Sequence, residues 1–345
     1  MFLTKILRAH FKIMDIKKIA IIGSNSFSGS HAVDYFLTNS DARVIGISRS
    51  PEYDYIFLPY LYKKERSPKF KFFQLDVNKD MDRIINLLDR EEPEAIINFA
   101  AQGNVEHSWK NPEDWFKTNC LGVMNLTNRL KDKKYIKKYI QISTPEVYGP
   151  CENFKESLNY YSPSTPYAAS KAAADLFLLT LFKNFNFPVS FVRSANVYGT
   201  HQQLYRIIPK TVICLKKGEK LPLQGGGKTV RSFVHIKDVV RGIHDILMKG
   251  KNGEVYHFAT EGLAIRDLVK KICSKMNRDF ESSVEITSER VGKDSFYGLD
   301  SSKVKRELNW EAQITLDEGI DEVISWVNGC WDKIVKYPLT YIHKP

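Results

Sequence analysis

Two residues near the middle of the chain have the chemistry and the spacing of a proton-transfer pair. Tyr167 and Lys171 stand four residues apart at the start of a predicted helix, so their side chains share one face. Thr165 is suited to cap that helix and Pro166 to be its first residue. Because a neighbouring ammonium favours the tyrosinate, the phenol could act as a base close to neutral pH. For an isolated pair, a surface tyrosine beside a solvated lysine is the alternative.

A hydroxyl and a carboxylate precede this pair. Residues 139–143 form a predicted strand, and Thr144 and Glu146 follow its carboxyl end. Ligands of parallel sheets bind beyond such ends, so we expect both side chains to face Tyr167 across one site. A carboxylate placed there can remove and return a proton, whereas the alternative is a carboxylate on a loop without a chemical role.

The elements that must position these groups begin with a strand, a glycine turn and a helix. Residues 17–22 are an unbroken apolar run typical of a buried parallel strand, and residues 31–37 have a helical pattern. Glycines between them permit a tight turn and close packing of helix on strand, and the helix N-terminus would face a pyrophosphate. The predicted cofactor residues of this turn are Gly23, Asn25, Ser26, Phe27, Ser28 and Gly29.

Similar apolar runs recur along the chain. The further predicted strands are residues 43–47, 72–75, 94–99 and 189–193. The predicted fold class is therefore α/β, with a Rossmann-type doubly wound parallel sheet and a smaller C-terminal α/β substrate domain. We expect an N-terminal extension at 1–16, an NAD(P)-binding Rossmann domain at 17–188 and a partly interleaved nucleotide-sugar domain at 189–345.

Six short motifs carry a family resemblance. They are GSNSFSG (23–29), NFAAQ (98–102), STPEVYG (143–149), YAASK (167–171), RSANVYG (193–199) and RSF (231–233). In this order they resemble an extended short-chain dehydrogenase/reductase, and within that group the nucleotide-sugar 4,6-dehydratases acting on dTDP-glucose or GDP-mannose. The resemblance extends over residues 17–327.

The resemblance implies an NDP-hexose 4,6-dehydratase, a hydro-lyase that forms a 4-keto-6-deoxy sugar by internal hydride transfer. Tyr167, assisted by Lys171, would take the proton of the sugar 4-hydroxyl while C4 gives hydride to the cofactor. Thr144 would hydrogen-bond O4, and Glu146 would remove the C5 proton before the C6 hydroxyl leaves and hydride returns to C6. Where the dTDP-glucose group has Asp and the GDP-mannose group Ser, this chain has Pro145, so Glu146 would also protonate the leaving hydroxyl.

The cofactor contacts implied by the resemblance follow the ends of the predicted strands. NAD-preferring proteins place an acid about twenty residues past the glycine turn, but this chain has Ser48 and Arg49, which favour NADP over NAD. An exposed arginine after a strand is the alternative. The remaining expected contacts are Asp76, Val77, Ala100, Ala101, Gln102, Asn119, Tyr167 and Lys171. Asp76 could instead cap a helix, and Asn119 could make only a local bond to the backbone.

Polar residues of the second half supply the expected substrate contacts. The resemblance and the donor chemistry assign the nucleotide sugar to Asn104, Thr144, Glu146, Asn196, Arg206, Lys210 and Arg231. A salt bridge between Arg231 and Asp238 is the competing interpretation. Residues 225–228 lack the spacing of a phosphate loop and are predicted to be a hairpin.

Composition indicates a soluble globular protein. The 345 residues are 43% hydrophobic, and no apolar run approaches the roughly 18 residues of a membrane span. The net charge is +11, but the lysines are scattered, which favours a solvated surface and a phosphate-bearing substrate over a nucleic-acid partner. Five widely spaced cysteines indicate free thiols in a reducing, cytoplasmic setting and no metal site.

Several alternatives stay open at this level. An enzyme of the same superfamily could stop at 4-epimerisation or 4-oxidation, and a silent cofactor-binding or RNA-binding protein is the second rival. Basic residues in the first twelve positions could belong to a transit peptide, although an optional extension is favoured. A homodimer through the helices near Asn119 and Lys171 is the family expectation. The tail at 328–345 lies beyond the resemblance and is predicted to pack against an unidentified surface.

Overall fold

A computed structural model describes residues 16–288 and 297–344. All but the last residue of the expected extension at 1–16 lies outside the described residues. No helix within the described ranges is long and apolar enough to cross a membrane.

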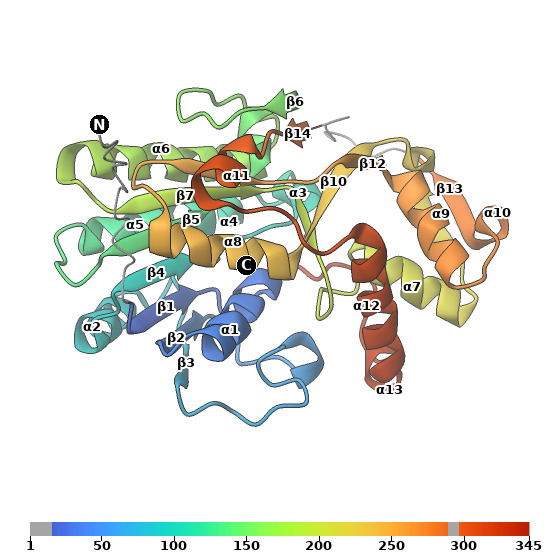
Figure 1. The fold of residues 1–345 in the computed structure, drawn as a ribbon, viewed down its shortest axis with the longest axis horizontal. Helices are drawn as coiled ribbons and strands as arrows, with labels where there is room; N and C mark the ends of the chain where they lie inside the picture. Colours follow the sequence, from blue (N-terminus) through green and yellow to red (C-terminus); the bar gives the residue numbers. More distant parts are fainter. Residues whose placement is uncertain (1–15, 289–296, 345) are drawn as a thin grey trace, which may run out of the picture.

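A parallel sheet of seven strands forms the centre of the fold (Figure 1). Its order is β11-β7-β5-β4-β1-β2-β3, and every neighbouring pair is parallel. The strands are β1 (Lys18–Ile22), β2 (Arg43–Ser48), β3 (Phe70–Gln74), β4 (Ala95–Asn98), β5 (Lys138–Ile142), β7 (Val189–Ser194) and β11 (Val255–Phe258). The order reverses between β1 and β4, which opens a ligand crevice at their carboxyl ends. The predicted Rossmann-type fold class is confirmed.

Both faces of the sheet are buried, which explains why its strands are apolar without alternation. Ile19 and Ile21 belong to one hydrophobic cluster, whereas Ala20 and Ile22 belong to the other. The first cluster is covered by α1 (Phe27–Asn39) and α8 (Ile236–Lys249), and the second by α2 (Met81–Glu91), α5 (Gly122–Leu130) and α6 (Pro166–Phe185).

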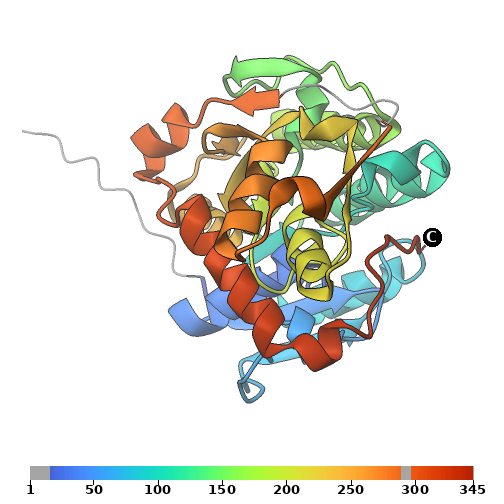
Figure 2. The ribbon, with the colours of Figure 1, turned by 90° about the vertical axis from the view of Figure 1, so that its right-hand side faces the viewer.

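A smaller α/β region lies at the carboxyl edge of the large sheet (Figure 2). Its strands form a β12-β10-β8 sheet and a β13-β9 pair. The bounds are β8 (Asn196–Tyr198), β9 (Leu221–Gln224), β10 (Val230–His235), β12 (Gly262–Ala264), β13 (Val284–Thr287), α7 (Ile207–Lys217), α9 (Ile265–Lys275) and α12 (Leu316–Gly329). A third hydrophobic cluster joins these helices and strands. Because β7, α8 and β11 belong to the large sheet layer, the chain crosses between the two parts after residue 188.

Short elements connect these layers. A β14-β6 pair joins β6 (Cys151–Phe154) to β14 (Tyr297–Leu299). The others are η1 (Tyr55–Phe57), α3 (Val105–Ser108), α4 (Pro112–Phe116), η2 (Lys117–Leu121), η3 (Pro145–Tyr148), η4 (Gly225–Gly227), α10 (Phe280–Ser283), α11 (Ser302–Leu308) and α13 (Trp331–Ile334).

The predicted hairpin at residues 225–228 is wrong. The three glycines of η4 all have positive φ and turn the chain from β9 into β10, but β9 pairs with β13 while β10 pairs with β8 and β12. Local turn signals gave the reversal correctly, whereas pairing across it depends on contacts with distant strands.

Candidate active site

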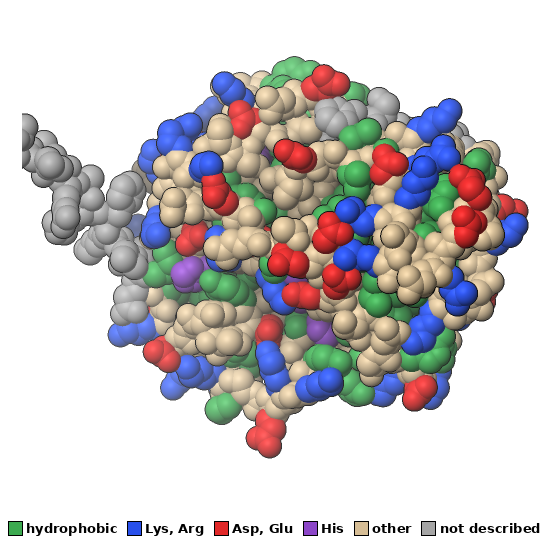
Figure 3. All heavy atoms as spheres, turned by 45° about the vertical axis from the view of Figure 1, so that its right-hand side comes forward, with side chains coloured by type: hydrophobic (Ala, Val, Ile, Leu, Met, Phe, Trp, Pro, Cys, Tyr) green, Lys and Arg blue, Asp and Glu red, His purple; other side chains and the backbone are tan. Residues whose placement is uncertain are grey.

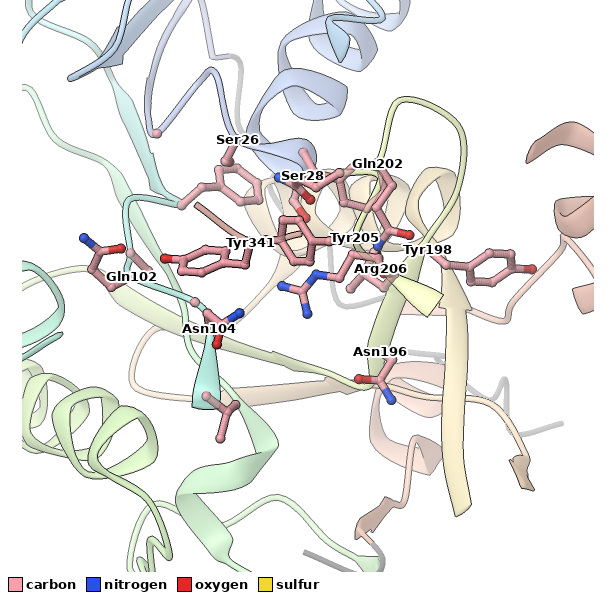
Figure 4. A pocket seen from close by; sticks show the side chains of 18 of the residues that line it. Ser26, Ser28, Gln102, Asn104, Asn196, Tyr198, Gln202, Tyr205, Arg206 and Tyr341 are labelled. Atoms are coloured by element: carbon pink, nitrogen blue, oxygen red, sulfur yellow. The ribbon is translucent and has the colours of Figure 1, made fainter. Parts of the chain in front are cut away.

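A cavity of about 1380 Å³ lies along the carboxyl edge of the large sheet, between it and the smaller region (Figure 4). Most of the predicted site residues line it. These are Gly23, Asn25, Ser26, Phe27, Ser28, Ser48, Arg49, Asp76, Val77, Ala100, Ala101, Gln102, Asn104, Thr144, Glu146, Tyr167, Asn196, Arg206, Lys210 and Arg231. Gly29, Asn119 and Lys171 do not line the cavity and lie behind its wall.

The glycine turn has the shape that a dinucleotide requires. Gly23 has φ +84°, and a Cβ built on it would lie 2.6 Å from the Ala100 nitrogen. A Cβ on Gly29 would lie 2.2 Å from the Gly23 carbonyl oxygen, so the start of α1 packs directly on the turn. Ser26 caps α1 by accepting a hydrogen bond from the Gly29 nitrogen at 3.0 Å. Its φ of −68° needs no glycine, which explains why serine is compatible with this position.

The end of β2 is fastened to this turn. The Ser48 hydroxyl accepts a hydrogen bond from the Asn25 nitrogen at 2.9 Å, and the Asn25 amide donates to the carbonyls of Ser50 and Pro51. Ser48 is buried, whereas Arg49 is half-buried and directs its guanidinium to the Lys344 carbonyl at 2.8 Å. Arg49 is therefore the cation that the cavity presents at the end of β2.

Asp76 and Asn119 hold the loops that follow β3 and β4. Asp76 accepts a hydrogen bond from the Asn78 nitrogen at 2.8 Å and so shapes the turn before α2. Asn119 is buried within η2, a π-helix, which is a frequent geometry at functional sites. Its side-chain oxygen accepts a hydrogen bond from the Gln102 nitrogen at 2.7 Å. Its side-chain nitrogen donates to the Gln102 carbonyl and to the Ser170 hydroxyl, each at 3.0 Å. Asn119 thus fixes the backbone after β4 against α6, one residue before Lys171.

The predicted helix of the proton-transfer pair is α6. The Thr165 hydroxyl accepts from the Ala168 nitrogen at 3.1 Å, and Pro166 occupies the first turn. The buried Lys171 ammonium donates to the Ile142 carbonyl at 2.6 Å, and burial lowers the pKa of Lys171 to about 8.

The electrostatics of Tyr167 differ from the expectation. Burial, and then the charge of Glu146, raise the pKa of Tyr167, while a hydrogen bond with Thr144 and the charge of Arg206 lower it. The Lys171 ammonium is directed to the end of β5, so the help that Lys171 is expected to give to the ionised phenol stays a prediction. Thr144 and Arg206 are the groups that favour the tyrosinate here.

The segment after β5 explains Pro145. Residues 145–148 form the short 3-10 helix η3, whose cap is Thr144, accepting from the Glu146 nitrogen at 3.3 Å. Pro145 is the first residue of that turn, where its missing N–H costs nothing. The turn places Glu146 within electrostatic reach of Tyr167 and on the same cavity.

A buried ion pair that sequence reasoning did not single out supports this segment. Asp175, one turn after Lys171, accepts from Arg193 at 2.7 Å and from the Ser143 hydroxyl at 2.6 Å. The side chains of the ion pair are fully buried, and the Arg193 guanidinium lies 4.4 Å from the centre of the Tyr148 ring. The pair ties the end of β5 to β7 and α6, just behind Thr144.

The substrate side is formed by the start of α7 and the strands β8 and β10. Arg206 precedes α7 and points into the cavity beside Tyr205 in Figure 4, and Lys210 lies one turn further along. Asn196 begins β8, and Asn104 caps α3 by accepting from the His107 nitrogen at 3.0 Å. These donors, with the N-terminus of α7, suit a diphosphate.

The competing pairing of Arg231 with Asp238 is wrong. Asp238 instead accepts from Arg241 at 2.8 Å and from the Gln313 and Ile314 nitrogens, each at 3.0 Å. Arg231 is buried in β10, donates to the Val230 carbonyl at 2.8 Å and lines the cavity.

The sequence did not indicate that the C-terminal tail forms one wall of the cavity. After α13 the chain returns to the site, and Tyr337, Pro338, Leu339, Thr340, Tyr341, Ile342 and Lys344 line it. The aromatic residues of this tail were the available signal, but they do not indicate which surface it covers. Among the described residues, no group of three or more His, Cys, Asp or Glu side chains could hold a metal.

The fold and this cavity define a class of protein. A dinucleotide turn on a doubly wound sheet, with Tyr-x-x-x-Lys on α6 and Thr-x-Glu after β5, is the arrangement of an extended short-chain dehydrogenase/reductase. A family model described as GDP-mannose 4,6 dehydratase matches residues 21–323. The chain belongs to this family of nucleotide-sugar 4,6-dehydratases, as predicted.

Individual relatives agree with this membership. The chain is 31% identical over 317 residues to a trifunctional UDP-glucose 4,6-dehydratase/UDP-4-keto-6-deoxy-D-glucose 3,5-epimerase/UDP-4-keto-L-rhamnose-reductase of Arabidopsis thaliana. That match covers 90% of this chain but 47% of the plant protein, so the chain spans about half its length. It is 30% identical over 327 residues to dTDP-D-glucose 4,6-dehydratase of Mus musculus, covering 90% and 88% of the two chains.

A solved structure gives the same result. The crystal structure of DesIV, a dTDP-glucose 4,6-dehydratase from Streptomyces venezuelae with NAD and TYD bound, matches with a TM-score of 0.82 and 30% identity. The match covers 90% of this chain and 97% of DesIV.

Proposed function

We propose that the protein is an NDP-hexose 4,6-dehydratase that converts a nucleotide-diphosphate hexose to its 4-keto-6-deoxy derivative. The observation that carries this proposal is the meeting of Tyr167, Thr144 and Glu146 on one cavity that also contains a dinucleotide turn. A phenol base, a hydroxyl donor and a carboxylate are the groups that oxidation at C4 and elimination across C5 and C6 require.

The first proton is handled by Tyr167. Its phenolate takes the proton of the sugar 4-hydroxyl, while the Thr144 hydroxyl orients O4. The hydrogen bond between Thr144 and Tyr167 and the charge of Arg206 stabilise the ionised phenol. Lys171, held by the Ile142 carbonyl, keeps the start of α6 against the end of β5. When bound, a nicotinamide dinucleotide would supply a reversible hydride acceptor for the sugar.

Glu146 performs the elimination. Its carboxylate removes the C5 proton, which a 4-ketone makes acidic, and returns a proton to the leaving C6 hydroxyl. Pro145 leaves no acid between Thr144 and Glu146, so one carboxylate serves both directions of proton transfer.

Support for a dinucleotide comes from the shape of the turn. Cβ atoms at Gly23 and Gly29 would meet the Ala100 nitrogen and the Gly23 carbonyl oxygen, so these glycines let the α1 N-terminus pack against the turn, where it can face a pyrophosphate. Asn25, Ser26, Phe27 and Ser28 surround it. Asp76, Val77, Ala100, Ala101 and Gln102 would line the adenosine half, with Asn119 fixing the backbone of Gln102.

We favour NADP over NAD, the cofactor named with DesIV, because Arg49 follows the end of β2 and no acid comes after it before Glu52. Replacing Arg49 by Ala should weaken binding of NADPH about tenfold or more and change binding of NADH less than about threefold. The difference between the two cofactors is the readout, since Arg49 also contacts the tail. Equal effects on NADH and NADPH would exclude a 2′-phosphate contact. Fluorescence titration of each reduced cofactor gives both affinities.

The nucleotide diphosphate would bind Arg206, Lys210 and Arg231 together with Asn196, while Asn104 would contact the sugar. A panel of GDP-, dTDP-, CDP- and UDP-hexoses, analysed by mass spectrometry, tests the function. One member should give a product lighter than its substrate by one water. A product of unchanged mass would indicate an epimerase and not a dehydratase. A product lighter by two hydrogens would indicate an oxidase. No turnover, with salt-sensitive RNA binding, would favour a silent protein.

We further propose a cytoplasmic homodimer without nucleic-acid or membrane partners. Phe116, Leu121 and Leu176 are 39%, 51% and 47% exposed on α4, η2 and α6, the helices expected at a dimer interface. All five cysteines are free, which fits a reducing compartment. Lysine, arginine and acidic side chains are interspersed on the face shown in Figure 3, without one broad basic patch.

A further inference from the structure

The C-terminal tail, residues 337–344, returns to the edge of the large sheet and runs over the cavity (Figure 2). The family model ends at residue 323, so this segment lies outside the matched region. Its course brings Tyr341 between Gln102 and Tyr205 in Figure 4, which joins the predicted cofactor side to the predicted substrate side.

The last described residue bridges two strand ends. The Lys344 carbonyl oxygen accepts hydrogen bonds from the Arg49 guanidinium at 2.8 Å and from the Gln102 amide at 2.7 Å. Arg49 follows β2 and Gln102 follows β4, and these strands flank β1 in the sheet. The bridge therefore spans the end of β1, where Gly23 begins the dinucleotide turn.

Side chains of the tail hold it in this position. His343 pairs with Asp114 at 2.7 Å and stacks on Trp115, with ring centres 5.2 Å apart and planes at 13°. Tyr341 contacts the ring of His107 at 4.7 Å and that of Tyr205 at 5.4 Å between centres. Specific contacts to α3, α4 and the segment before α7 argue against a chance resting place.

The tail borders the cavity and does not fill it. About 1380 Å³ remains with the tail in place, more than the roughly 300–1,000 Å³ of a pocket for one drug-sized ligand. Space for a dinucleotide and a nucleotide sugar is thus compatible with the seated tail.

We propose that residues 340–344 are an integral wall of the cofactor site: they close over a dinucleotide bound at the glycine turn, and the Lys344 carbonyl bridge slows its release. The inference rests on the proposed function only in requiring that this cavity binds a nicotinamide dinucleotide. A reaction that recycles its cofactor gains from such retention, because the reduced form must stay until its hydride is returned.

Release of NADPH and of NADH, measured by the change in their fluorescence when excess oxidised cofactor displaces them, tests this wall. Removing residues 340–345 should accelerate release about tenfold or more, the effect of losing one or two hydrogen bonds and the covering contacts. His343→Ala, which removes the hydrogen bond to Asp114 and the stacking on Trp115 but keeps the chain length, should accelerate it about threefold or more. Lys336→Ala is the matched control: it changes an exposed lysine just before the tail that does not line the cavity, and it should change release less than about twofold.

The outcomes separate this inference from the proposed function. Unchanged release in both the truncated chain and His343→Ala overturns the wall, even where a 4-keto product forms. Faster association with unchanged release in the truncated chain would make the tail a plug, which also overturns it. Faster release without any dehydrated product would uphold the wall and reject the dehydratase. Failure of the full chain to bind either cofactor would reject both, and thermal unfolding of each variant verifies folding.

Discussion

Replacing Tyr167 by Phe should lower the turnover number for 4-keto product by roughly 10²- to 10⁴-fold, the usual contribution of a positioned general base. The substitution removes one oxygen from a partly buried side chain and keeps its aromatic ring at the start of α6. Affinity for the cofactor should therefore change less than about threefold. Product mass and steady-state rates measure the loss of turnover, and fluorescence titration measures the cofactor affinity.

Thr165→Ser is a suitable control for this experiment because it keeps the hydroxyl that caps the same helix. It should retain turnover within a few-fold. If Tyr167→Phe turns over at a rate close to that of the unmodified chain, Tyr167 has no role in proton transfer. Loss of cofactor binding along with turnover would instead indicate that the substitution disturbs the cavity.

The sheet and its dinucleotide turn could be predicted because their determinants are local. Residues 19–22 are apolar without alternation since both faces of β1 are covered, and Gly23 follows directly because a positive φ and the approach of Ala100 require it. The helix of Tyr167 could be predicted for the same reason, because its start is determined locally by Thr165 as the cap and Pro166 as the first residue.

The direction of long side chains could not be read in the same way. A spacing of four residues placed Tyr167 and Lys171 on one face, but burial directs the Lys171 ammonium to a carbonyl at the end of β5. The hydroxyl that hydrogen-bonds the phenol comes from Thr144, 23 positions earlier, and is brought there by the sheet. Such contacts depend on tertiary packing, and a sequence pattern does not give the distance between residues that are far apart along the chain.

Two other features were hidden for related reasons. Asp175 is one polar residue on a helix that reads as apolar, and its importance follows only from its burial beside Arg193 and Ser143. The tail has aromatic residues, but its docking surface combines α3, α4 and the ends of β2 and β4. No local pattern specifies a surface assembled from so many separate segments.

Replacing Glu146 by Gln should separate the two halves of the reaction. The amide keeps the size of the side chain but cannot accept the C5 proton, so formation of the dehydrated product should fall by roughly 10²- to 10⁴-fold. Oxidation at C4 depends on Tyr167 and should continue. In deuterated water, the C5 position of the recovered sugar should no longer acquire deuterium, and mass spectrometry reports both this exchange and the loss of water.

The same variant makes a prediction about pH that a merely structural role would not produce. The negative charge of Glu146 raises the pKa of Tyr167, so its removal must lower that pKa. Since the ionised phenol is the active base, the acidic limb of the pH profile for oxidation at C4 should move to lower pH in Glu146→Gln. A limb that stays in place would show that Glu146 does not face the phenol, and deuterium exchange at the unmodified rate would show that it does not remove the C5 proton. A shifted limb with exchange abolished requires the carboxylate and the phenol to act on one bound hexose, which is the arrangement that distinguishes elimination from simple oxidation at this site.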